Sequence, residues 1–144
     1  MEQKKTQKDK CYASSMRMLV RREHSTLELK QKLSAKGFDS DLVDCTISKL
    51  TQENKQSDSR FSEDFIRMRF NQGKGPIKIA IELKQRGINT SDFSEFDFYT
   101  LAKNIRQIKF GCGFPSDFKE TAKQKRFLQS RGFDFEHIKY AFTE

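Results

Sequence analysis

The chain has 144 residues and a formal net charge of +8, and its charged residues (33%) almost equal its apolar ones (35%). This length suits one domain or a short repeat array, and the low apolar content argues against a single large core. No run of about 18 apolar residues occurs, and the charged first ten residues lack the apolar segment of a secretory signal, so we expect no membrane partner.

The N-terminal part predicts a short lead-in followed by helices. Residues 1–10 are expected to be a flexible basic lead-in. Ser25 and Glu28 form an S-x-x-E capping box that starts a helix. Asp39 or Ser40 is expected to cap the next helix, along which apolar residues recur at helical spacing.

The middle part predicts three further helices. Phe61, Phe65 and Met68 mark one that ends near Gly73. Pro76 suits the first position of the following helix, because its ring fixes a helical φ and the missing N–H has no partner there. A third helix is expected to begin at Asn89, Thr90 or Ser91 and to carry Phe93 and Phe96.

The C-terminal part predicts the last three helices. One ends at Gly111, the next starts at Ser116 and carries Phe118, and the last is capped by Asp134. Most of the 14 phenylalanines recur at helical spacing, which favours core packing over base stacking; Phe114, in a loop, fits core packing least well.

Three glycines return with the same surroundings, at Gly37, Gly87 and Gly132. A leucine stands four positions before each, a cation directly before it and an apolar residue six positions after it: Leu33, Leu83 and Leu128; Lys36, Arg86 and Arg131; Val43, Phe93 and Ile138. Such a glycine can close a helix in the left-handed conformation. The pattern predicts an all-α fold of three tandem three-helix repeats, with about nine helices in an elongated curved array. The repeats are expected at 11–56, 57–97 and 98–144.

The sequence shows no motif with the residue spacing of a catalytic or metal-binding site. The two histidines, His24 and His137, lie in different repeats, and neither has a cysteine or second histidine at metal-ligand spacing. The glycine-rich segments at 73–75 and 111–113 lack the Lys-Ser/Thr step that holds phosphate. Three widely separated cysteines indicate a reducing compartment without disulfides. We expect no enzymatic activity, no metal and no cofactor.

Basic residues occur as a cluster in each repeat. Residues 1–54, 55–102 and 103–144 contribute net charges of +3, +1 and +4. Clusters of this kind favour polyanions or acidic protein surfaces, although an ordinary solvated surface explains each cluster taken alone about equally well. The candidate contact residues are Arg21, Arg22, Lys36, Arg67, Arg69, Lys74, Lys78, Lys123 and Arg126.

Several stretches resemble the RecX family of recombination regulators. They are "RREHSTLELKQKL" followed by "KGFD", then "DSRFSEDFIRMRFNQGKGPIKIAIELKQRGI", and "FDFYTLAKNIRQIKFG" with "KQKRFLQSRGFDFEHI". The resemblance extends from about Tyr12 to Phe142. Two positions depart from the family: Ser59 stands where a second acidic residue is usual, and Phe98 stands where a tryptophan is frequent.

The resemblance implies three tandem three-helix repeats and a bacterial, cytoplasmic regulator. It implies binding to the RecA nucleoprotein filament and modulation, mostly inhibition, of its recombinase, ATPase and coprotease activities. The charge pattern keeps an alternative open, namely sequence-independent binding of bare single- or double-stranded DNA by a helical-repeat protein. We expect a monomer, since no unpatterned apolar stripe is left over.

Overall fold

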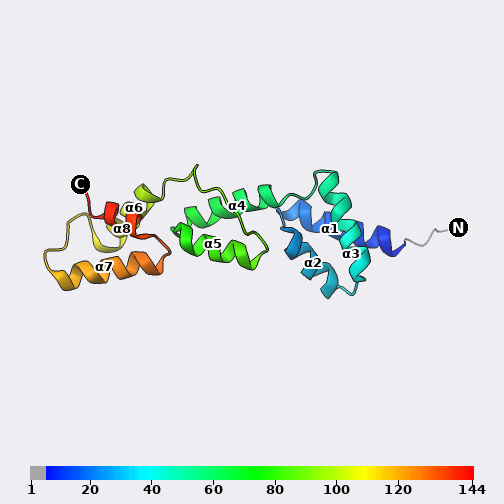
Figure 1. Ribbon diagram of the computed structural model, residues 1–144, viewed down its shortest axis with the longest axis horizontal. Helices are drawn as coiled ribbons and strands as arrows, with labels where there is room; N and C mark the ends of the chain where they lie inside the picture. The colour runs from blue at the N-terminus through cyan, green and yellow to red at the C-terminus, as the bar shows by residue number, and fades with distance from the viewer. Residues whose placement is uncertain (1–5) are drawn as a thin grey trace. The chain divides into compact units, whose positions relative to one another are not determined.

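The computed structural model describes residues 6–144, and these residues form eight α-helices and no strand (Figure 1). This agrees with the predicted all-α class. The helices are α1 (Gln7–Arg21), α2 (Thr26–Ala35), α3 (Ser40–Gln52), α4 (Asp58–Asn71), α5 (Pro76–Gln85), α6 (Phe98–Phe110), α7 (Phe118–Ser130) and α8 (Phe135–Ala141).

Helix α1 begins inside the predicted lead-in of residues 1–10. Residues 1–5 lie outside the described residues, and residues 7–10 already belong to α1. The reason is a capping box formed by Thr6 and Asp9, which is not among the predicted helix starts. The Thr6 hydroxyl accepts the Asp9 N–H at 3.1 Å, and the Asp9 carboxylate accepts the Thr6 N–H at 3.4 Å.

The other helix starts follow mostly from short polar caps. Ser25 and Glu28 form the predicted capping box, and Asp39 and Asp134 cap α3 and α8 as expected. Ser116 was the wrong cap for α7. Asp117 fills this position, because its carboxylate accepts the Glu120 N–H at 2.6 Å.

The predicted ninth helix, at the end of the second repeat, does not form. Residues 89–97 contain turns but no helix. The Asp92 carboxylate accepts the Ser94 N–H at 2.9 Å, and the Phe96 N–H donates to the Phe93 carbonyl at 3.0 Å. Short polar side chains that bind nearby backbone groups compete with helix formation, and this segment has four of them in succession at 89–92. Asp97 then caps α6.

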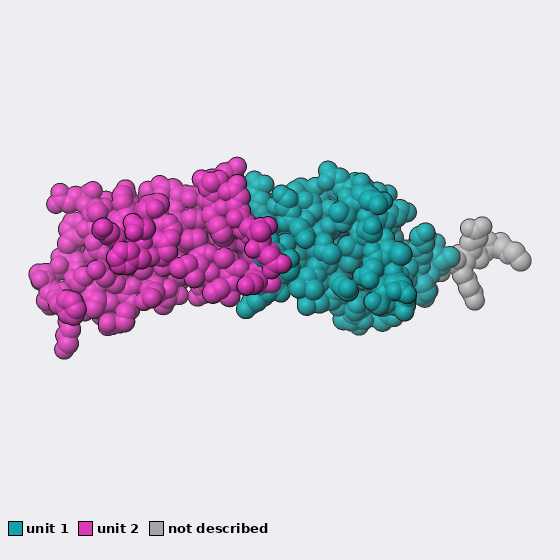
Figure 2. All heavy atoms as spheres, in the orientation of Figure 1, with its two compact units in different colours: residues 1–64, 85–88 teal, residues 65–84, 89–144 magenta. Residues whose placement is uncertain are grey.

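The chain folds into two compact units, which are coloured in Figure 2. Unit 1 contains residues 1–64 and 85–88, and unit 2 contains residues 65–84 and 89–144. The core of unit 1 joins α1, α2 and α3. Its buried members are Cys11, Leu29, Leu33, Val43 and Ile47.

In unit 2, α6 packs against α7 and α8. Phe98, Ala102, Leu128 and Phe133 are each 3% exposed or less. Phe118, which the helical pattern places in the core, is instead 88% exposed, and Phe135 of α8 is 74% exposed. Met68 on α4 is also exposed, by 44%. The elongated and curved form of the array remains a prediction.

The three repeated glycines have the predicted backbone conformation. Gly37, Gly87 and Gly132 have φ of 92°, 82° and 96°, in the left-handed region. Leu33, Leu83 and Leu128, one turn earlier, are fully buried. Of the apolar residues six positions later, Val43 and Ile138 are buried within helices, but Phe93 is half-buried in the turn that replaces the ninth helix.

Candidate interaction surface

The basic residues of the first repeat have different surroundings. Arg21, the last residue of α1, is exposed. Arg22 forms a bidentate ion pair with Glu28, in which both N–O distances are 3.1 Å, and it donates to the Glu23 carbonyl at 2.7 Å. Lys36 donates to the Ser14 hydroxyl at 2.9 Å. Arg22 therefore holds the turn between α1 and α2, whereas Arg21 is the more available for a partner.

The arginine–glutamate pair lowers the pKa of Glu28. Burial alone would raise the pKa of this carboxyl, but hydrogen bonds from Arg22 and from the Ser25 N–H, together with the arginine charge, outweigh it. Glu28 thus stays ionised and supports both the capping box and the Arg22 guanidinium.

In the second repeat, two of the predicted contact residues meet at one carboxylate. Arg69 contacts Glu82 at 2.9 Å and Lys74 contacts it at 3.4 Å. The Arg69 guanidinium also lies 4.9 Å from the centre of the Phe65 ring. These three charged side chains are each about one-fifth exposed, so this cluster is partly neutralised within the fold.

The remaining predicted residues lie on other elements of unit 2. The Arg67 guanidinium stands 5.7 Å from the Phe96 ring centre. Lys78 on α5 and both Lys123 and Arg126 on α7 are exposed. Three of the nine candidates therefore belong to unit 1 and six to unit 2, and only Arg69 and Lys74 share a described ion-pair partner.

In unit 1, the start of α4 contacts the turn before α2. The Asp58 carboxylate accepts the Thr26 N–H at 2.8 Å and the Gln56 amide at 2.9 Å. Arg60 contacts the Glu23 carboxylate at 2.9 Å and donates to Asn54 through both terminal nitrogens. The start of α4 is thereby joined to the turn before α2. The residues in contact are more than 30 positions apart in the sequence, so no local pattern predicts this contact.

His24 lies buried beside the same turn. Its Nδ1 is 3.0 Å from the Arg22 carbonyl, and its Nε2 is 2.9 Å from Lys32 Nζ. A neutral ring can donate from Nδ1 and accept from Lys32, whereas a protonated ring would repel the ammonium. Burial is the largest cause of a lowered His24 pKa, and the Arg22 and Lys32 charges add to it. This surrounding supports a structural role for His24.

Arg106, absent from the predicted set, is fully buried in the third repeat. It donates to the Ala141 carbonyl at 2.8 Å, the Gly113 carbonyl at 3.2 Å and the Gln124 amide oxygen at 3.3 Å. Its guanidinium lies 5.0 Å from the Phe114 ring centre and 5.2 Å from that of Phe142. Arg106 therefore ties the loop after α6 to α7 and to the end of α8.

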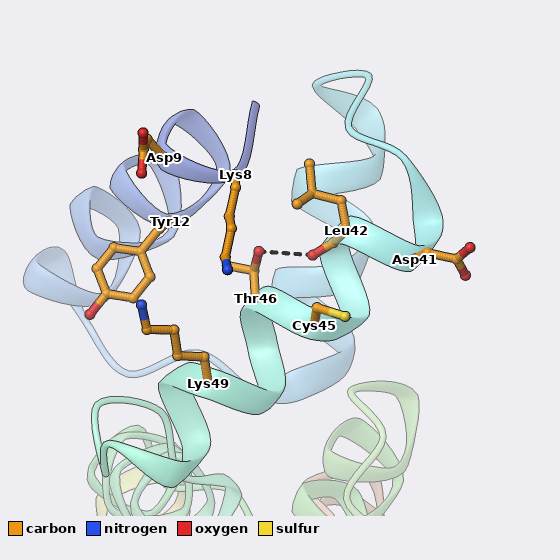
Figure 3. A pocket seen from close by; sticks show the side chains of 8 residues that line it. All are labelled: Lys8, Asp9, Tyr12, Asp41, Leu42, Cys45, Thr46 and Lys49. Atoms are coloured by element: carbon orange, nitrogen blue, oxygen red, sulfur yellow. Dashed lines mark hydrogen bonds between the residues drawn. The ribbon is translucent and has the colours of Figure 1, made fainter. Parts of the chain in front are cut away.

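Unit 1 also has an open pocket of about 400 Å³ between α1 and α3 (Figure 3). Its lining consists of Lys8, Asp9, Tyr12, Asp41, Leu42, Cys45, Thr46 and Lys49. The Thr46 hydroxyl donates to the Leu42 carbonyl at 2.8 Å, and Lys49 stands over the Tyr12 ring. No histidine is among its lining residues.

In residues 6–144, no three His, Cys, Asp or Glu side chains gather as a metal site would require. No helix there combines the length and apolar character needed to cross a bilayer. Cys11 is buried and the other two cysteines are exposed, and all three are free thiols.

The eight helices and the three repeated left-handed glycines define an all-helical protein built from short repeats. The chain belongs to the RecX family: residues 11–50, 57–95 and 97–142 match its first, second and third three-helix domains. The second match includes residues 89–95, which belong to the segment without a helix.

Relatives agree with this family assignment, and a solved structure agrees with the fold. The regulatory protein RecX of Halorhodospira halophila is 37% identical over 134 residues, covering 89% of this chain and 83% of the relative. That of Pseudomonas entomophila is 38% identical over 131 residues, covering 87% and 84%. The crystal structure of RecX from Lactobacillus salivarius has a TM-score of 0.81 at 19% identity over 94% of each chain, which supports the fold.

Proposed function

We propose that this protein binds the RecA nucleoprotein filament and modulates it, mostly by inhibiting recombination, ATP hydrolysis and coprotease activity. The main support is that all three repeats match consecutive RecX domains, in chain order, across nearly the whole length. The basic side chains described above supply a distributed contact surface for acidic protein patches and DNA phosphates. No catalytic step is part of this proposal.

Seven of the nine candidate residues fall into two groups according to whether they make a described ion pair. Arg22, Arg69 and Lys74 are paired with carboxylates, so their replacement also removes contacts that stabilise the fold. Four others are exposed and make no described ion pair: Arg21, Lys78, Lys123 and Arg126. A test of binding should use the second group.

The test is a quadruple charge reversal, R21E/K78E/K123E/R126E. We expect it to abolish inhibition of RecA-catalysed, DNA-dependent ATP hydrolysis while the helical content measured by circular dichroism stays unchanged. A control with the same change in net charge is K10E/R17E/K84E/K139E, at four exposed positions outside the candidate set. Equal inhibition by the wild type and the first variant at the same dose would refute the basic surface.

Binding of bare DNA is the second candidate function, and the net charge of +8 favours it. Contacts to phosphates alone give affinity that falls steeply as salt increases, because bound counterions are released. A regulator directed at the filament should instead prefer the filament over naked DNA at physiological salt. The protein is expected to act as a monomer in either case.

A further inference from the structure

Cations are paired differently in the two halves of the chain. Before α6, carboxylates compensate several of them: Arg60 contacts Glu23 and Arg69 contacts Glu82, both at 2.9 Å. Residues 103–144 contain nine Lys and Arg but only five Asp and Glu. None of these nine cations takes part in the ion pairs described for residues 6–144. The third repeat therefore has the least compensated positive charge.

Helix α7 concentrates this charge. It contains four exposed cations, Lys119, Lys123, Lys125 and Arg126. The carboxylate in the same helix, Glu120, accepts a hydrogen bond from Gln124 at 3.3 Å, and Asp117 is occupied as the N-cap. Both acids of this region thus have roles within the helix and leave the lysines unpaired.

The positions of these cations oppose helix stability. Lys119 and Lys123 are one turn apart, and Lys123 and Arg126 are three residues apart, so each pair repels across the helix surface. Lys119 also stands in the first turn, where the helix dipole disfavours positive charge. None of these cations makes an ion pair in the described fold, and a polyanionic ligand would relieve their mutual repulsion.

An exposed aromatic residue precedes Lys119 in the first turn of α7. Phe118, the first residue of α7, is 88% exposed, whereas Phe127 of the same helix packs against Phe110 with ring centres 5.4 Å apart. Proteins that bind single-stranded nucleic acid combine cations, which follow the phosphate backbone, with aromatic rings, which stack on the bases. An unpaired base offers its face to such a ring, while duplex bases are stacked on each other.

We infer that α7 is the single-stranded DNA contact of this protein. Lys119, Lys123 and Arg126 bind successive phosphates, and Phe118 stacks on an unpaired base. This inference rests on the proposed function, in which the partner is a filament that contains DNA. It assigns the DNA contact to the third repeat, while Arg69 and Lys74 of the second repeat are held by Glu82.

The test measures binding of the full chain to a dye-labelled oligothymidylate by fluorescence anisotropy, without RecA. We expect K119Q/K123Q/R126Q to lose at least about tenfold in affinity at low salt, and the slope of log Kd against log salt to fall by about 2. The matched control K10Q/R17Q/K84Q loses the same charge at exposed positions and should stay within about threefold of the wild type.

Phe118 is tested separately. F118A should weaken single-strand binding about tenfold with an unchanged salt slope, and F118Y should restore it. Binding to a duplex of the same length should not respond to F118A. Equal affinities of the α7 triple variant and its control would overturn the inference, as would an F118A variant that binds oligothymidylate like the wild type.

These outcomes are separable from the proposed function. A wild-type protein that leaves RecA-catalysed ATP hydrolysis unchanged would refute the proposed function, whatever α7 does with bare DNA. A protein that inhibits RecA normally while the α7 variants bind oligothymidylate unchanged would refute the α7 inference alone.

Discussion

Gly75 and Gly132 lie backbone against backbone in unit 2. The Gly75 N–H donates to the Arg131 carbonyl at 2.7 Å, and the Ile77 N–H donates to the Gly132 carbonyl at 3.0 Å. A Cβ atom added to Gly75 would lie 2.3 Å from the Gly132 carbonyl carbon. The stop turn of the third repeat therefore binds the start of α5 in the second, which explains why glycine is required on both sides.

Gly75→Ala should destabilise the protein by at least about 2 kcal/mol, because the clash is with backbone that no side-chain rotation can relieve. Urea unfolding followed by circular dichroism measures this loss. Gly113→Ala is the control, since nothing lies within 4 Å of its added Cβ and its φ is outside the left-handed region. Equal stability of the two variants would contradict this packing.

Arg106→Met should destabilise the third repeat by about 3 kcal/mol, because it leaves the Ala141 and Gly113 carbonyls and the Gln124 amide without their donor. Arg106→Lys should not restore stability, since an ammonium cannot reproduce the planar fork of donors. Thermal unfolding checks both. Lys139→Met, at an exposed position of α8, should change stability by less than about 0.5 kcal/mol.

Lowering the pH should destabilise the protein through His24. Its pKa is lowered in the folded state, chiefly by burial, so the unfolded chain binds a proton more readily. Stability is therefore full above the unfolded pKa of about 6.5 and falls as the pH drops toward the folded pKa, by at most about 1.4 kcal/mol per pH unit. Urea unfolding at several pH values between 7.5 and 5 should show a weaker pH dependence in His24→Gln than in the wild type. The same dependence in both proteins would exclude His24 as its source.

Arg69→Gln and Arg126→Gln remove the same charge but should differ in stability. Arg69 contacts Glu82, Gln72 and the Phe65 ring, so we expect a loss of about 1 kcal/mol. Arg126 is exposed on the repelling row of α7, and its replacement should be neutral or slightly stabilising. Melting temperatures of the two variants at low and high salt make the comparison. A larger loss of stability in Arg126→Gln than in Arg69→Gln would contradict this and would mean that the Arg126 charge stabilises the fold.

Local signals predicted the features that depend on local chemistry. The capping box at Ser25, Pro76 at the start of α5 and the left-handed stop glycines each follow from a backbone requirement within a few residues. The apolar helical pattern predicts that Phe118 packs in the core, but its side chain is exposed. Helix α7 has 13 residues, whereas α2 and α5, which precede the other two repeated glycines, have 10. Phe118 lies in the additional first turn of α7.

Contacts between distant residues gave no such signal. Arg106 reads as a surface cation, and its partners are 7, 18 and 35 residues away. Asp58 and Arg60 reach back more than 30 residues to Thr26 and Glu23. The charge pattern identified the basic clusters, but only the ion pairs of the fold separate the compensated second repeat from α7.

The most direct measurement compares two affinities of the wild-type protein in one titration series at physiological salt. Labelled protein is titrated with preassembled RecA filaments on single-stranded DNA, and separately with the same DNA alone. The account predicts a clear preference for the filament, with the bare-DNA affinity falling more steeply as salt increases. Equal affinity for both, with the same dependence on salt, would contradict it and favour a protein that acts on DNA alone.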